Sequence, residues 1–180
     1  MLDLIIRNGK CYIDGELKEV DVSIKDKKIH QIGQISEEAK ETIDASGHTV
    51  LPGCIDTQTH FREPGSTDTE DLHSGSRAAI AGGITSVFEM PNTNPPTSNK
   101  KEFQRKLDLA KNRMYCNYAF YFGATADNAD DLASLKDLEG CCGIKLFAGS
   151  STGNLLVAEE DDIDKVFQNA SKVVAVHSED

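Results

Sequence analysis

Apolar and polar residues alternate with a period of two through the first 50 residues of the chain. The alternating segments end at the turn-forming pairs Asn8-Gly9, Asp14-Gly15 and Ser46-Gly47. Short alternating segments between glycine-containing turns are typical of strands with one buried face. Strands are expected at residues 4–6, 11–13, 20–24, 28–32 and 49–51. The pattern therefore predicts a small antiparallel β domain, shaped like a β-sandwich, over residues 1–50.

From residue 51 the pattern changes to an apolar strand, a polar loop and a helix-like stretch, repeated several times. Strands are expected at residues 51–57, 85–90, 115–122, 142–147 and 173–176, and helices at 68–81, 100–112, 129–139 and 159–170. A chain can start a further parallel strand only after a crossover, which is usually a helix. The alternation therefore predicts an α/β fold with a parallel sheet.

The pace of this alternation, about five βα units in about 130 residues, matches a (β/α)8 TIM-type barrel, which typically takes about 250 residues. We therefore predict that residues 51–180 form an incomplete (β/α) barrel. The last predicted strand is followed by only a few residues, so further strands are expected beyond residue 180. An open five-stranded α/β sheet is the alternative.

Charge and composition exclude several classes of partner. The chain has 19 basic and 30 acidic residues and a formal net charge of -11, which opposes the phosphate binding on which nucleic-acid affinity depends. No apolar run approaches the roughly 20 residues that span a bilayer, and the first residues do not resemble a signal peptide. The 5 cysteines are odd in number and form no CxxC pair, which favours reduced thiols. We expect a cytoplasmic protein with no nucleic-acid or membrane partner.

Polar side chains that could bind a metal or a substrate gather where the predicted barrel strands end. His60 and Arg62 follow the first strand, Asn92 follows the second, Lys145 lies in the fourth and His177 ends the fifth. In a (β/α) barrel the carboxyl ends of the strands face one mouth, where the active site lies. We therefore expect these residues to share one site.

Lys145 lies in a nearly apolar strand that would bury its amine. Burying an unpaired ammonium costs several kcal/mol or lowers its pKa, so some compensation is required. An ion pair with a carboxylate on a neighbouring strand would suffice, as would a side chain that reaches the surface at the strand end. Near His60 and His177 there is a third interpretation. An uncharged lysine amine takes up carbon dioxide to form a carbamate, whose oxygens can bridge metal ions.

His60 and His177 are each candidates for a metal ligand or for an ordinary hydrogen-bonded histidine. Their shared position at strand ends favours a metal site, because imidazole is the commonest protein ligand for zinc. Arg62 carries a forked group of donors that suits a substrate carboxylate. A salt bridge to Glu63 or to another acid of the loop is its alternative.

The motifs around these residues resemble those of a known family. Residues 52–65 read PGCIDTQTHFREPG, which resembles the DxHxHxREPG signature of dihydroorotases in the amidohydrolase superfamily. The segments Met90-Pro-Asn92, Gly143-Ile-Lys145 and Val176-His177 are similar to later motifs of that family, in the same order. The resemblance covers the whole chain, and the N-terminal β domain resembles the small composite domain of the family.

The resemblance implies an enzyme that reversibly hydrolyses the cyclic amide of dihydroorotate to N-carbamoyl-aspartate in pyrimidine biosynthesis. It implies that His60 ligates one zinc ion, His177 a second, and carboxylated Lys145 bridges them. It also implies that Arg62 and Asn92 hold the substrate carboxylate, and that the full-length protein forms a homodimer. The related allantoinases and dihydropyrimidinases, which open similar rings, are the nearest alternatives.

The chain departs from the family at Gln58, which stands where the first histidine of the HxH pair is expected. An amide oxygen is a poorer zinc ligand than imidazole, so either one or two metal ions are expected. Gln58 also motivates a different hypothesis, a non-catalytic dihydroorotase-like subunit that supports aspartate transcarbamoylase. The family's remaining histidine ligand and its catalytic aspartate are expected beyond residue 180, so the 180-residue chain alone is expected to be inactive.

Overall fold

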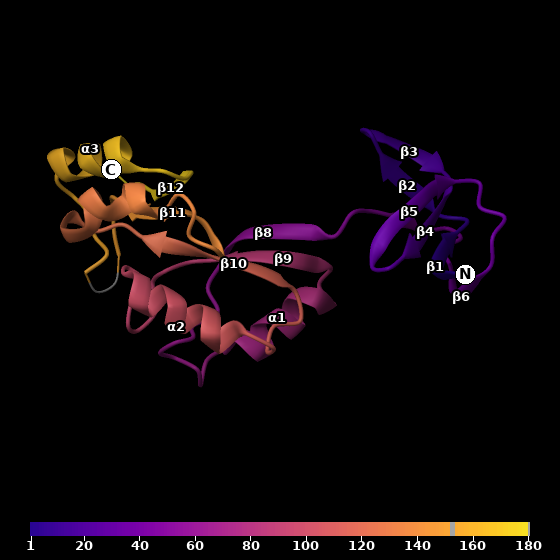
Figure 1. Ribbon diagram of the computed structural model, residues 1–180, viewed down its shortest axis with the longest axis horizontal. Coiled ribbons are helices and arrows are strands. Elements are labelled where there is room, and N and C mark those ends of the chain that lie inside the picture. The colour runs from indigo at the N-terminus through magenta and orange to yellow at the C-terminus, as the bar shows by residue number, and fades with distance from the viewer. Residues whose placement is uncertain (152–153, 180) are drawn as a thin grey trace. The chain divides into compact units, whose positions relative to one another are not determined.

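The computed structural model describes residues 1–151 and 154–179 (Figure 1). The predicted barrel segment, 51–180, also includes Thr152, Gly153 and Asp180, which lie outside the described residues. The chain divides into two compact units, Met1–Pro52 and Gly53–Asp180. In the described part of the chain, no helix is both long enough and apolar enough to cross a membrane.

The first unit folds into a four-stranded and a three-stranded sheet, with the orders β5-β4-β1-β6 and β3-β2-β7. The strands are β1 (Leu2–Arg7), β2 (Lys10–Ile13), β3 (Glu16–Glu19), β4 (Asp21–Lys25), β5 (Lys28–Gly33), β6 (Ala39–Asp44) and β7 (Thr49–Val50). Strand β4 pairs antiparallel with β1 and β5, and β2 pairs antiparallel with β3. Strands β6 and β7 add to these sheets in parallel. Sequence reasoning missed β3 and β6, because most of their side chains are exposed and no apolar alternation marks them.

The second unit confirms the predicted α/β fold, a partial (β/α)8 barrel after a small β region. Its parallel sheet has the order β12-β11-β10-β9-β8. The strands are β8 (Cys54–Thr59), β9 (Ile84–Glu89), β10 (Asn117–Gly123), β11 (Cys141–Phe147) and β12 (Val174–His177). The crossovers contain α1 (Leu72–Ala81), α2 (Lys100–Ala110), the 3-10 helix η1 (Ala126–Leu135) and α3 (Glu160–Asn169). Each strand therefore lies beside the next one in sequence, and all carboxyl ends lie at one edge.

The core of this unit lies between the sheet and its helices. Figure 1 shows α1 and α2 along the same side of β9 and β10. Phe103 of α2 packs edge-on against Phe120 of β10, with ring centroids 6.4 Å apart. Val87, Leu132 and Leu146 belong to the same buried cluster. Burial stabilises the fold by roughly 1.5–3 kcal/mol for each large apolar side chain, so this cluster stabilises the packing of the helices on the sheet.

Helix α1 begins four residues later than the pattern suggested, because a capping box sets its first turn. The Asp71 carboxylate accepts a hydrogen bond from the Ser74 amide at 2.6 Å, and the Ser74 hydroxyl accepts one from the Asp71 amide. This arrangement satisfies amides that a helix start leaves unpaired. The helix ends at Ala81, and Gly82 and then Gly83, with a φ of +85°, follow it.

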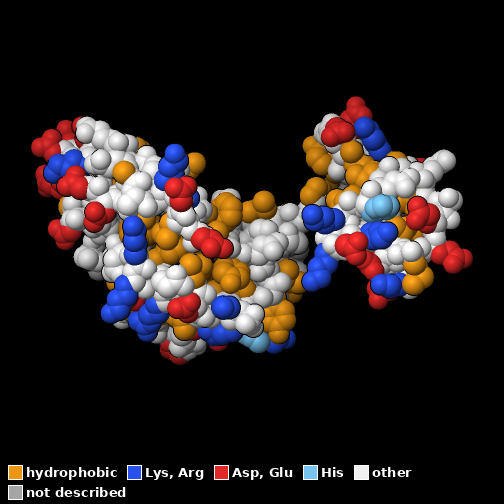
Figure 2. All heavy atoms as spheres, in the orientation of Figure 1, with side chains coloured by type: hydrophobic (Ala, Val, Ile, Leu, Met, Phe, Trp, Pro, Cys, Tyr) orange, Lys and Arg blue, Asp and Glu red, His pale blue; other side chains and the backbone are white. Residues whose placement is uncertain are grey.

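The predicted helix at 129–139 is instead a 3-10 helix over Ala126–Leu135. Its sequence is rich in Asp and Asn, which have low α-helix propensity, and it begins with a capping box in which the Asn128 side chain accepts a hydrogen bond from the Thr125 amide at 2.9 Å. Helix α3 has an acidic first turn, and Figure 2 shows acidic side chains gathered over it. Negative charge at this end complements the helix dipole.

Candidate active site

Three of the predicted site residues line one cavity at the carboxyl edge of the sheet. His60 directly follows β8, Asn92 follows β9 and His177 ends β12. The cavity measures about 380 Å³ and is lined by Gln58, His60, Asn92, Phe147, Ser150, Ser151 and His177. The parallel strand order therefore brings together side chains that lie far apart in sequence.

A hydrogen bond to Asn92 orients the ring of His60. The Nδ1 atom of His60 lies 3.0 Å from Oδ1 of Asn92. A side-chain amide oxygen only accepts, so Nδ1–H donates and Nε2 keeps its lone pair. Burial lowers the pKa of His60, the bond to Asn92 opposes this, and the positive charges of Arg62 and Lys145 lower the pKa further. Burial thus favours the neutral ring of His60, which is the form that binds a metal.

Lys145 is 3% exposed, and burial lowers the pKa of its amine. Its Nζ lies 4.9 Å from the centroid of the Phe147 ring. Among the described residues no carboxylate pairs with it, so the alternative of an ion pair with a neighbouring strand is not found. Lys145 is not itself among the residues that line the cavity, but Phe147 is. Phe147 also lies beside His177 in the sheet, with ring centroids 6.0 Å apart.

The ring of His177 has an unsatisfied nitrogen. Its Nε2 is buried and makes no hydrogen bond within the described residues, although the Glu179 carboxylate lies 3.4 Å away. The His177 carbonyl accepts hydrogen bonds from the amides of Ala148 and Gly149. The backbone is therefore anchored while one ring nitrogen lacks a hydrogen-bond partner.

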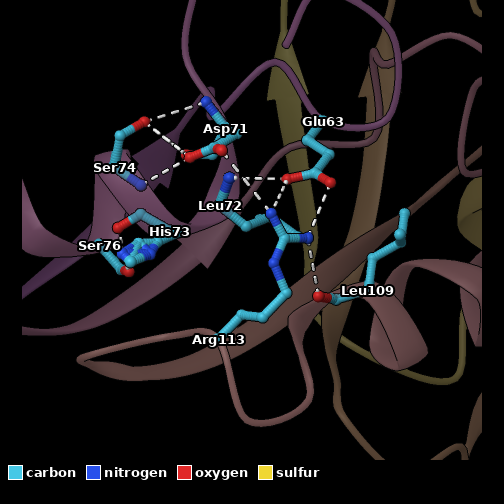
Figure 3. A network of polar contacts seen from close by, with 8 residues as sticks. All are labelled: Glu63, Asp71, Leu72, His73, Ser74, Ser76, Leu109 and Arg113. Atoms are coloured by element: carbon cyan, nitrogen blue, oxygen red, sulfur yellow. Dashed lines mark hydrogen bonds and ion pairs between the residues drawn. The ribbon is translucent and has the colours of Figure 1, made fainter.

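Arg62 lines a second cavity, of about 360 Å³, together with Asn92. Asn92 is common to both cavities. The alternative of an Arg62–Glu63 salt bridge is not found in the described structure, because the Glu63 carboxylate is bound by Arg113 at 2.8 and 3.1 Å (Figure 3). The guanidinium of Arg62 is thus left exposed beside the cavity that it lines.

Sequence reasoning missed a buried ion pair between Glu89 and Lys106 beneath the site. The Lys106 ammonium also donates to the Met90 carbonyl at 2.8 Å, and the backbone of Phe61 lowers the pKa of the Glu89 carboxyl. Burial raises the pKa of Glu89 to about 7, against the opposing effect of Lys106. The pair therefore contacts both loops that carry the predicted site residues.

The pattern of helix α2 held a signal for this pair. Its buried positions are Phe103, Lys106 and Ala110, spaced three and four apart, so Lys106 lies on the apolar face of the helix. A lysine in such a position requires a partner. Only the fold identifies that partner as Glu89.

The donor atoms of these side chains would suit a metal site only if a modified lysine supplied the oxygen ligand. The described residues contain no group of three or more His, Cys, Asp or Glu that could hold a metal ion. They do contain two histidine nitrogens suited to ligation, on His60 and His177, and the buried Lys145 amine without an anionic partner. A carbamate on Lys145 would supply the negative charge that the two histidines lack.

Sequence comparisons relate this chain to one family of proteins. A sequence model of the amidohydrolase family matches residues 49–177. An allantoinase of Escherichia coli is 40% identical over 149 residues, 82% of this chain. A dihydroorotase of Methanosarcina mazei is 35% identical over 184 aligned residues, 100% of this chain.

Solved structures agree with these sequence relatives. The L-hydantoinase (dihydropyrimidinase) of Arthrobacter aurescens has a TM-score of 0.90 and 30% sequence identity over 99% of this chain. The chain spans 33% of the allantoinase, 40% of the dihydroorotase and 41% of the hydantoinase. It therefore corresponds to between a third and about two fifths of these relatives.

Proposed function

Because this chain belongs to the amidohydrolase family, we propose that the protein containing it is a cytoplasmic, metal-dependent hydrolase of cyclic amides, of the dihydroorotase type. The relatives named dihydroorotase, allantoinase and hydantoinase support hydrolysis of a cyclic amide as the shared chemistry. The proposed reaction is the reversible opening of dihydroorotate to N-carbamoyl-aspartate. Association with itself or with aspartate transcarbamoylase stays a prediction.

The observation that carries this choice is that Arg62 and Asn92 line one cavity, while Asn92 also lines the cavity that contains His60 and His177. A substrate with a carboxylate beside its ring amide would place the carboxylate at Arg62 and the amide near the histidines. Hydrogen bonds to charged groups contribute about 1.5–3 kcal/mol each. They would hold the ring in position for attack by water.

We propose that His60 and His177 hold zinc and that carboxylated Lys145 bridges two ions. When bound, zinc supplies Lewis-acid chemistry by polarising the ring carbonyl. Asn92 keeps Nδ1 of His60 protonated, so that Nε2 retains the lone pair with which it would hold a zinc ion. Burial without a carboxylate partner keeps the Lys145 amine closer to its uncharged form, which is the form that takes up carbon dioxide.

A specific observation favours each of two other candidate functions. Similarity to allantoinases favours allantoin as substrate, a ring without a carboxylate. The side chain of Gln58, exposed and lining the cavity where the family has histidine, motivates a non-catalytic subunit. These candidates differ in substrate preference and in metal content.

The test is turnover by the full-length protein of dihydroorotate, allantoin and dihydrouracil, at matched concentrations. We expect dihydroorotate to have the highest kcat/KM, and Arg62→Met to reduce it by more than about tenfold because a charged hydrogen bond is lost. The matched control is Arg77→Met, an exposed arginine on α1. A higher kcat/KM on allantoin or dihydrouracil would overturn the proposal.

A further inference from the structure

Arg62 has an unusual backbone conformation. Its φ is +47°, in the left-handed region that residues with a Cβ rarely adopt. The Glu63 amide donates to the Phe61 carbonyl at 2.5 Å, and the Ser66 amide donates to the Arg62 carbonyl at 2.9 Å. Arg62 therefore lies at the apex of a tight turn. Such a conformation persists only where the surrounding structure holds it.

The next residue, Glu63, ties this turn to two helices. Its side chain is 9% exposed, and its carboxylate accepts from Arg113 at 2.8 and 3.1 Å and from the Leu72 amide at 2.9 Å (Figure 3). Arg113 also donates to the Leu109 carbonyl at 3.1 Å and lies 3.7 Å from the Asp71 carboxylate. The turn is therefore joined to the start of α1 and to the end of α2.

The same turn is joined to the loop after β9. The Asn94 amide donates to the Pro64 carbonyl at 2.9 Å. A Cβ added at Gly65 would lie 3.0 Å from Cβ of Asn94, so the two loops pack closely. A shift of this turn would therefore disturb the packing between the loop that carries Arg62 and the loop that carries Asn92.

We infer that the Glu63–Arg113 ion pair is a positioning device that aims Arg62 and so sets the protein's affinity for carboxylate-bearing cyclic amides. Neither member of the pair lines either cavity of the site. They act on the substrate only through the backbone of the Arg62 turn. This inference rests on the proposed role of Arg62 in binding the substrate carboxylate.

The alternative is an ion pair that only stabilises the fold. A stabilising pair would lower the yield of active protein equally for every substrate and leave KM unchanged. A positioning pair would raise KM for a carboxylate-bearing ring. It would leave kcat unchanged, and it would also leave KM for an uncharged ring unchanged. The split between KM and kcat therefore distinguishes the two roles.

The kinetic test uses the full-length protein with Arg113→Met, Glu63→Gln and the double variant. We expect KM for dihydroorotate to rise about tenfold in each, with KM for dihydrouracil unchanged. The double variant should be no worse than either single variant, because the two residues act as one unit. Arg113→Lys keeps the positive charge but loses the paired donors of the guanidinium group, and it should give an intermediate KM for dihydroorotate. The matched control is Arg105→Met, an arginine of α2 whose side chain is 53% exposed and pairs with Glu102.

The second measurement is hydrogen exchange of the backbone amides of residues 61–63, of Gly65 and Ser66, and of Leu72. Arg113→Met should speed exchange in this segment, and Arg105→Met should not. Unchanged exchange, or an equal rise in KM for both substrates, would overturn the inference. If Arg62→Met itself leaves KM for dihydroorotate unchanged, the proposed function of Arg62 fails. The exchange result then still decides whether the pair holds the turn.

Discussion

The Glu89 carboxylate and the Lys106 ammonium form an ion pair in which the two side chains are 1% and 0% exposed. Glu89 ends β9, and Lys106 lies on α2. Through Phe61 and Met90 the pair reaches the loops that carry His60 and Asn92. Two buried charges that satisfy each other can thus hold both loops without contacting a substrate.

Removing one member of this pair should destabilise the protein strongly. Lys106→Met leaves the Glu89 carboxylate buried without its cation, and breaking a buried pair in this way costs about 3–5 kcal/mol. Replacing both residues, with Glu89→Leu and Lys106→Met, should cost less, because no buried charge remains. Urea denaturation of the full-length protein measures the free energy of unfolding. Lys101→Met, an exposed lysine on the same helix, is the control and should change it by less than about 0.5 kcal/mol.

Replacing Lys145 should remove metal from the protein. Lys145→Ala deletes the amine that would become the bridging carbamate. Metal affinity should fall by more than about 100-fold, since even partners outside the ligand shell are worth 10–100-fold. Elemental analysis after dialysis measures the metal bound, and reconstitution of the wild type with zinc should require bicarbonate. Lys136→Ala, an exposed lysine, serves as control, and equal metal content in the two variants would contradict the carbamate.

Replacing Gln58 should strengthen metal binding. Gln58→His adds an imidazole to the cavity that already contains His60 and His177, and imidazole is a better zinc ligand than an amide oxygen. We expect higher metal content and turnover at least equal to that of the wild type, measured on the same preparation. Gln104→His, on the exposed side of α2, is the control. A wild type that has neither metal nor activity, in contrast to an active Gln58→His variant, would favour the non-catalytic subunit.

Asp71 should contribute to the loss of stability in acid. Hydrogen bonds from the Ser74 backbone and side chain, and then the charge of Arg113, lower the pKa of Asp71 from its usual 3.8. A carboxyl whose pKa is lower in the folded protein stabilises the fold above its unfolded pKa, and loses this effect as the pH falls through the folded pKa. The Tm advantage of wild type over Asp71→Asn should therefore be present at neutral pH and shrink below about pH 4. Calorimetry of both proteins from neutral pH to below about pH 4 measures this Tm difference. A Tm difference that does not depend on pH would contradict the prediction.

The sequence by itself determined the order of strands and helices in the barrel unit and the positions of polar residues at strand ends. Periodicity records which side chains a local element buries, so it predicted the strand that His60 follows and the strands of Lys145 and His177. It missed β3 and β6, because their mostly exposed side chains show no such period.

Only the tertiary structure decided which side chains become partners. Glu63 and Arg113 are 50 positions apart in the chain, and nothing in either local pattern points to the other. The same holds for Glu89 with Lys106 and for His60 with Asn92. Local periodicity reports burial within one element, whereas an ion pair or a hydrogen bond depends on how two elements pack. The family motifs could therefore indicate the chemistry, and only the packing of strands and helices showed how its groups are held.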